Sequence, residues 1–162
     1  MVPDILAFKK EIKDYFTIKE LGQLNKHLGV WYEWGSDKDG RYLESNMEDF
    51  VQGMFEDFKD LFGRLPKIAS TPPAVPGSSL RKNTDGEIVL HSEYRSMVGK
   101  ILYFVKKVSP VCANACRELS QNLESPNGES HWMAVERLLG YLRADITKRK
   151  LKMRTPIELC PQ

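Results

Sequence analysis

The sequence predicts an α+β fold, with a helix and a β-hairpin followed by a mainly helical bundle. Hydrophobic residues recur at helical spacing in five segments, whereas one aromatic and β-branched run is typical of a strand. A stretch rich in Pro, Gly and Ser separates the two parts. The predicted organisation is a first helix, hairpin and following helix at 1–63, a connector at 64–92, a bundle at 93–154 and a tail at 155–162.

The N-terminal part is predicted to contain one amphipathic helix and one hairpin. Apolar residues recur at helical spacing from Asp4 to Tyr15, with lysines on the opposite face. Residues Leu28–Trp34 have the composition of a strand. Arg41–Leu43 is its expected partner, because the intervening residues 35–40 are typical of a turn.

A second amphipathic helix is predicted from Ser45 to Phe62. Ser45 and Glu48 have the spacing of a capping box, and Gly63 is the expected stop. Prolines and glycines dominate residues 64–91. An irregular segment of that length is expected to wrap over a surface or to join two lobes.

The C-terminal part is predicted to be a small antiparallel bundle of three helices. The first spans about Ser92–Lys107, the second begins near Ser109 and runs through Leu123, and the third spans about Ser130–Leu142. Their short connections favour antiparallel neighbours.

Composition restricts the class of protein. The 162 residues suffice for one domain, or for a small domain with an appendage. No apolar run reaches the length of a membrane span, and the acidic start differs from a signal peptide. Three cysteines (Cys112, Cys116 and Cys160) suit a reducing compartment, so the expected location is intracellular, in cytoplasm or nucleus, without a membrane partner.

Charge is distributed unevenly along the chain. Up to Leu90 there are twelve Lys/Arg and fifteen Asp/Glu, whereas the remainder has twelve and seven. The basic excess is greatest near the end, at Arg143, Lys148, Arg149, Lys150, Lys152 and Arg154. Such a run binds phosphates by releasing counterions, and a solvated helix end explains it equally well.

Four short motifs occur in a fixed order along the chain. They are Phe16–Leu24 running into His27–Val30, then Ser70-Thr71-Pro72, then Tyr94–Tyr103, and finally Ser125-Pro126 with His131–Ala134 and Arg137–Leu142. Together they resemble the second half of a copia-type retrotransposon reverse transcriptase, an RNA-directed DNA polymerase. The polymerase centre of that family is a Tyr-Val-Asp-Asp turn that lies upstream of the matching region. No two aspartates are adjacent in this chain.

The resemblance implies a polymerase part without its chemistry. It makes the first helix the last palm helix, Leu28–Leu43 the primer-grip hairpin, and Ser45–Phe62 with the later bundle the thumb and connection. The implied role is non-catalytic binding of an RNA/DNA primer–template duplex. Catalysis would require an upstream fingers and palm segment. We therefore expect no cofactor in this chain, with Mg²⁺ only in a complete polymerase.

Two groups of residues are candidates for nucleic-acid contact. The hairpin has rings and a cation that can rest on sugar or base faces, at Trp31, Tyr32, Trp34 and Arg41. Strand alternation allows only one face to do so, and a hairpin core explains the rings as well. The second group consists of cations for phosphate contact, or for a solvated face: Lys100, Lys106, Lys107, Lys148, Arg149 and Lys150.

Other chemistry receives little support from the sequence. The densest carboxylates, Glu48-Asp49 and Glu56-Asp57 with Asp60, fall on the polar face of an amphipathic helix, which favours solvation over a two-metal site. Cys112 and Cys116 have a spacing that can hold zinc, with His131 as a third ligand, but small buried thiols are far commoner. We expect no catalytic residue and no metal site.

A different class of function remains open. A retroelement-derived chain can serve as a protein–protein interaction module, or it can be a remnant without function. An exposed hairpin edge and an apolar surface on the palm side would favour a homo-oligomer or strand addition. Salt separates these alternatives, because phosphate binding weakens as salt rises whereas apolar association persists.

Overall fold

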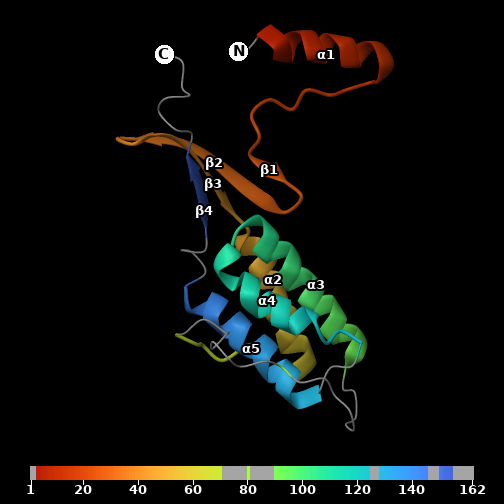
Figure 1. Cartoon of the computed structure of the whole chain (residues 1–162), viewed down its shortest axis with the longest axis vertical. Coiled ribbons are helices and arrows are strands. Elements are labelled where there is room, and N and C mark those ends of the chain that lie inside the picture. Colours follow the sequence, from red (N-terminus) through yellow and green to blue (C-terminus); the bar gives the residue numbers. More distant parts are fainter. Residues whose placement is uncertain (1–2, 71–79, 81–89, 125–127, 146–149, 155–162) are drawn as a thin grey trace.

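The computed structural model describes residues 3–70, 80, 90–124, 128–145 and 150–154. In this part of the chain, a four-stranded antiparallel sheet stands beside a bundle of helices, and helix α1 (Pro3–Tyr15) lies apart from both (Figure 1). The predicted α+β class is confirmed.

The sheet has the strand order β1-β2-β3-β4. Its strands are β1 (Lys26–His27), β2 (Val30–Asp37), β3 (Gly40–Asn46) and β4 (Leu151–Arg154). The connection between β1 and β2 is two residues long, and both Leu28 and Gly29 have positive φ, at 48° and 78°. Two successive positive φ values suit the right-handed twist of a tight hairpin. The predicted hairpin is present as β2 and β3, with longer strands and a shorter turn than the sequence indicated.

Strand β4 differs from the prediction, which assigned this segment to the end of the helical bundle. Residues Leu151–Arg154 pair antiparallel with β3, so that Leu151 faces Ser45 and Met153 faces Leu43. Apolar and basic residues alternate in β4, and an alternation with a period of two fits a strand rather than a helix.

The predicted capping box at Ser45 is wrong. Ser45 belongs to β3, is only 1% exposed, and its hydroxyl donates to the carbonyl of Leu151 at 3.4 Å. Helix α2 (Glu48–Phe62) begins later, without a side-chain cap. The predicted stop is confirmed, because Gly63 has φ of 69° and its N–H donates to the carbonyl of Lys59 at 2.7 Å.

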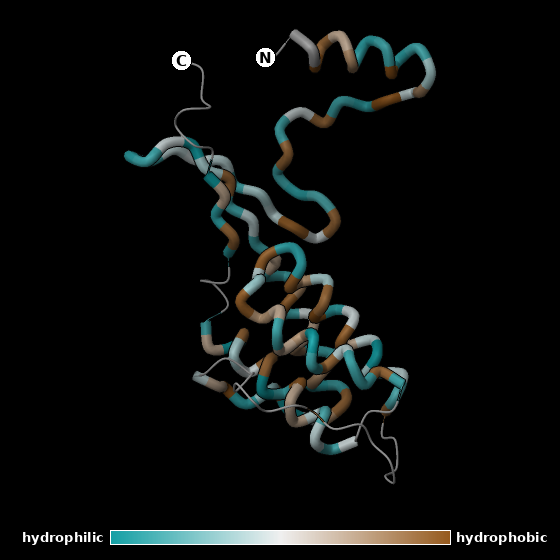
Figure 2. Tube along the Cα trace, in the orientation of Figure 1, coloured by the Kyte–Doolittle hydropathy of each residue, from teal (hydrophilic) through white to brown (hydrophobic). Residues whose placement is uncertain are grey.

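The hydrophobic core lies within a bundle of four helices. Helix α2 packs with α3 (His91–Lys107) and α5 (Gly128–Ala144), and α4 (Ala113–Ser120) packs against α3 and α5. Hydrophobic and hydrophilic stretches alternate along the helices of this bundle (Figure 2), and all four helices contribute buried apolar side chains. The prediction placed α2 outside the later bundle, but its apolar stripe shares the bundle core. The second predicted helix is shorter than expected, because a 3-10 turn at Pro110–Cys112 precedes α4.

The described start of the connector runs along α5. Arg64 forms a two-pronged ion pair with Glu136, and the N–H of Lys67 donates to the same carboxylate at 3.1 Å. The N–H of Ala69 donates to the carbonyl of Gly140 at 3.2 Å. This part of the connector therefore lies on the surface of α5, which agrees with the first of the two predicted alternatives, a segment that wraps over a surface. Residues 71–79 and 81–89 of the connector, and the predicted tail, lie outside the described residues.

Candidate nucleic-acid interface

The register of the sheet separates the aromatic residues that the sequence placed together. Trp34 pairs with Leu43, which pairs with Met153, and cross-strand partners share a face of the sheet. Tyr32 is two residues from Trp34 and shares its face, where it packs against the core of the bundle. Trp31 points to the opposite face. Tyr32 is therefore a packing residue, as the hairpin-core alternative predicts. Trp34 lies on the same face but farther from the bundle, where it stays exposed.

A groove of about 780 Å³ lies along the outer part of this face. Its lining includes the apolar side chains of Trp34, Leu43 and Met153, together with Gln23. The indole N–H of Trp34 donates to the carbonyl of Leu24 at 2.9 Å, and yet the residue stays 51% exposed. One edge of the ring is thus anchored, while much of its surface is available to a ligand.

Arg41 adds a cation to the same groove. It lies opposite Ser36 in the neighbouring strand, and its side chain is exposed. Among the described residues, no carboxylate forms an ion pair with it. A guanidinium beside an exposed indole can bind a phosphate while a base or sugar rests on the ring.

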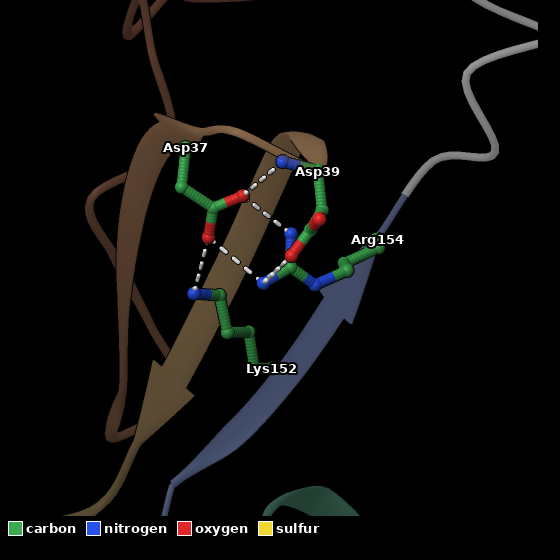
Figure 3. Close-up of polar contacts among 4 residues, drawn as sticks. All are labelled: Asp37, Asp39, Lys152 and Arg154. Carbon is green, nitrogen blue, oxygen red and sulfur yellow. Dashed lines mark hydrogen bonds and ion pairs between the residues drawn. The ribbon is translucent and has the colours of Figure 1, made fainter.

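Unlike Arg41, the cations of β4 form ion pairs with carboxylates of the hairpin (Figure 3). Arg154 donates to both oxygens of Asp37, at 2.6 and 2.8 Å, and Lys152 donates to Asp37 at 3.0 Å. The hydrogen bonds from Arg154, followed by that from Lys152, hold the pKa of Asp37 far below its usual range. These ion pairs attach β4 to the hairpin, and they offset the charge that Arg154 and Lys152 can offer to a phosphate.

Trp31 lies in an acidic environment. Its indole N–H donates to Asp49 at 2.9 Å, and the ammonium of Lys26 lies 4.1 Å from its ring centroid. The shallow hollow beside it, of about 350 Å³, is also lined by Glu33 and Glu48. These carboxylates repel phosphate, so Trp31 is poorly placed for contact with nucleic acid.

The predicted phosphate-binding cations differ in availability. Lys100 forms an ion pair with Asp57 at 2.6 Å, and Lys150 forms one with Glu44 at 2.8 Å. Lys106 and Lys107 are exposed at the end of α3, and the ammonium of Lys107 lies 5.9 Å from the ring centroid of Tyr103. The hydroxyl of Tyr103 donates to the carbonyl of Leu28, which places this helix end near the β1–β2 turn.

Two of the predicted cations, Lys148 and Arg149, lie outside the described residues. Sequence reasoning also missed two apolar residues of the groove, Leu43 and Met153. The signal that could have identified Met153 was the alternation from Lys150 to Arg154, which the basic charge of this segment obscured.

The candidate zinc ligands are embedded in the core. Cys112 and Cys116 are each 1% exposed, and His131 is fully buried. Burial, and then the neighbouring Cys112, raises the pKa of the Cys116 thiol to about 11, which keeps it protonated. In the described part of the chain, no three His, Cys, Asp or Glu side chains are grouped for a metal ion. None of the described helices combines the length and hydrophobicity of a membrane span.

Comparison with known proteins gives one informative similarity. The chain is 28% identical over 148 residues to the retrovirus-related Pol polyprotein from transposon TNT 1-94 of Nicotiana tabacum. The match covers 86% of this chain and 10% of the tobacco protein, so the chain spans about a tenth of that relative. No family model matches the sequence, and no solved structure matches it. The similarity supports an origin of this chain in a retrotransposon Pol polyprotein.

Proposed function

We propose that the chain is the primer-grip, thumb and connection part of a copia-type reverse transcriptase, and that it binds primer–template nucleic acid without extending it. The groove carries this proposal, because it is lined both by Arg41, which forms no ion pair with the described residues, and by Trp34, an exposed indole. The similarity over 148 residues to a Pol polyprotein supports the retroelement context.

In this proposal, the β2–β3 hairpin corresponds to the primer grip and the four-helix bundle to thumb and connection. Helix α1 corresponds to the last palm helix, and an upstream fingers and palm segment would cover its apolar face. That segment would also supply the aspartates and the Mg²⁺ that polymerisation requires.

The ion pairs decide which cations contribute most. Lys100 and Lys150 already have carboxylate partners, so transferring either one to a phosphate gains little charge interaction. Arg41, Lys106 and Lys107 have no such ion pair among the described residues. Contacts of this kind are independent of nucleotide sequence and depend strongly on salt.

Fluorescence anisotropy with a labelled RNA–DNA duplex tests the proposal. We expect salt-sensitive binding, and Arg41→Gln should weaken it and lower the slope of log affinity against log salt by about 1. Arg95→Gln is the matched control, because Arg95 is an exposed cation in the first turns of α3, away from the sheet. Absence of binding at low salt, or equal effects of the two variants, would contradict the proposal.

A further inference from the structure

Helix α1 presents an apolar stripe that no described element covers. Ile5, Phe8 and Tyr15 lie at helical spacing and are 47%, 59% and 78% exposed. The helix lies apart from the sheet and the bundle, and its hydrophobic positions are visible in Figure 2. An isolated helix of only 13 residues is marginally stable in water. The stripe therefore requires an apolar partner.

The same chain also has an exposed apolar surface on its sheet that can receive an apolar helix face. The groove on the sheet is lined by Trp34, Leu43 and Met153, and Trp34 and Met153 are 51% and 43% exposed. Apolar patches that remain open in this way commonly mark interaction sites.

The charges at the two surfaces are complementary. Glu11 flanks the apolar stripe of α1, three residues from Phe8, and Arg41 lines the groove. Neither has an ion-pair partner among the described residues. By contrast, Lys9 and Lys13 of the helix are bound to Glu20 at 3.3 and 2.7 Å. Glu11 thus offers a negative charge beside the stripe, and Arg41 offers a positive charge beside the groove.

We propose that α1 of one copy of this chain docks in the groove of a second copy, forming a dimer with exchanged N-terminal arms. The base of the arm is fixed at the sheet, because Lys26 and His27 form β1 and the carbonyl of Leu24 accepts a bond from Trp34. From there, residues 16–25 carry α1 away from its own sheet (Figure 1). Reciprocal exchange of such an arm closes a two-fold dimer.

This dimer requires no nucleic acid. It competes with the proposed function at both surfaces, because it uses the groove assigned above to nucleic acid and the face of α1 that an upstream palm segment would cover. Sedimentation velocity of the full chain, without nucleic acid, from low to high micromolar concentration tests dimerisation alone. We expect Phe8→Glu to weaken the dimer about tenfold or more, because it places a carboxylate in an apolar contact. Lys10→Glu, on the opposite face of α1, should leave it intact.

Two further experiments identify the surfaces. Glu11→Arg and Arg41→Glu should each weaken the dimer, and the double variant should restore it. In addition, Phe8→Cys and Met153→Cys, made in separate chains that both carry Cys160→Ser, should form a disulfide between the two chains when they are combined and oxidised by dissolved oxygen. A monomer at all concentrations, a dimer that Phe8→Glu leaves intact, or no disulfide between the Phe8→Cys and Met153→Cys chains would overturn the proposal.

Discussion

Arg154 in β4 binds both carboxylate oxygens of Asp37 at the end of β2, although 117 positions separate them in the sequence. Lys152 binds the same carboxylate, and its ammonium lies 3.6 Å from the ring centroid of Tyr42. Tyr42 in turn lies over Gly35, where a Cβ would meet its ring. These contacts attach a strand of only four residues to the edge of the hairpin, and they complete the groove by bringing Met153 beside Leu43.

Acid should release this attachment. The pKa of Asp37 in the folded chain is held below its unfolded value of about 3.9, so the carboxylate stabilises the fold above that pH and loses this effect as pH falls through the folded pKa. We expect the free energy of unfolding to fall less steeply below about pH 4 in Asp37→Asn than in the parent chain. Urea unfolding at several pH values measures this, with Asp39→Asn as control because Asp39 makes only a 3.9 Å contact with Arg154. Equal acid dependence of the parent chain and Asp37→Asn would contradict the role of the carboxylate.

Gly140 should not tolerate a side chain. A Cβ at this position would lie 1.8 Å from the carbonyl oxygen of Lys67, so the connector would have to leave the surface of α5. We expect Gly140→Ala to destabilise the fold by about 1–3 kcal/mol, as overpacking does. Gly99→Ala in α3 is the control, since its Cβ meets nothing within 4 Å, and it should stabilise by up to about 1 kcal/mol. Thermal unfolding distinguishes them, and a stabilising effect of both would refute the close contact.

The two exposed tryptophans should differ in their effect on nucleic-acid binding. Loss of an aromatic ring that stacks on a base costs about 1–3 kcal/mol, so Trp34→Ala should lower affinity for an RNA–DNA duplex at least severalfold. Trp31→Ala should have little effect, because Asp49 accepts the hydrogen bond of its indole and Glu48 lines the same hollow. Anisotropy titrations of both variants at one salt concentration measure the difference. A larger loss of affinity in Trp31→Ala than in Trp34→Ala would show that the nucleic acid binds the other face of the sheet.

Cys116 should be unreactive in the folded chain. It is buried, and its thiol pKa is raised to about 11, so very little thiolate forms at neutral pH. We expect iodoacetamide to modify Cys116 only after unfolding, as measured by peptide mass spectrometry with and without urea. The same experiment on Cys116→Ser identifies the peptide. Rapid modification under native conditions would show that the α3–α4 contact opens readily.

Hydrophobic periodicity predicted most of the helices, because the apolar stripes of α2, α3 and α5 are the residues that the core buries. Periodicity failed where strand pairing or ion pairing between distant residues determines the local structure. Ser45 has the sequence context of a helix cap, but its hydroxyl bonds to Leu151 because β4 pairs there. Likewise, the basic charge of Lys150–Arg154 was visible in the sequence, whereas the carboxylates that bind Lys150, Lys152 and Arg154 come from residues more than a hundred positions away.

By itself, the sequence determined the α+β class, the hairpin, the stop at Gly63, and the aromatic residues from which an interface can be built. These features follow from local spacing and backbone preference, which neighbouring residues encode. Only the tertiary structure decided which ring lies in a groove, and that α2 shares one core with the later helices. It also decided which cations, within the described residues, have no carboxylate partner. Those outcomes depend on strand register and long-range charge pairing. A one-residue change in register moves every side chain to the other face of the sheet.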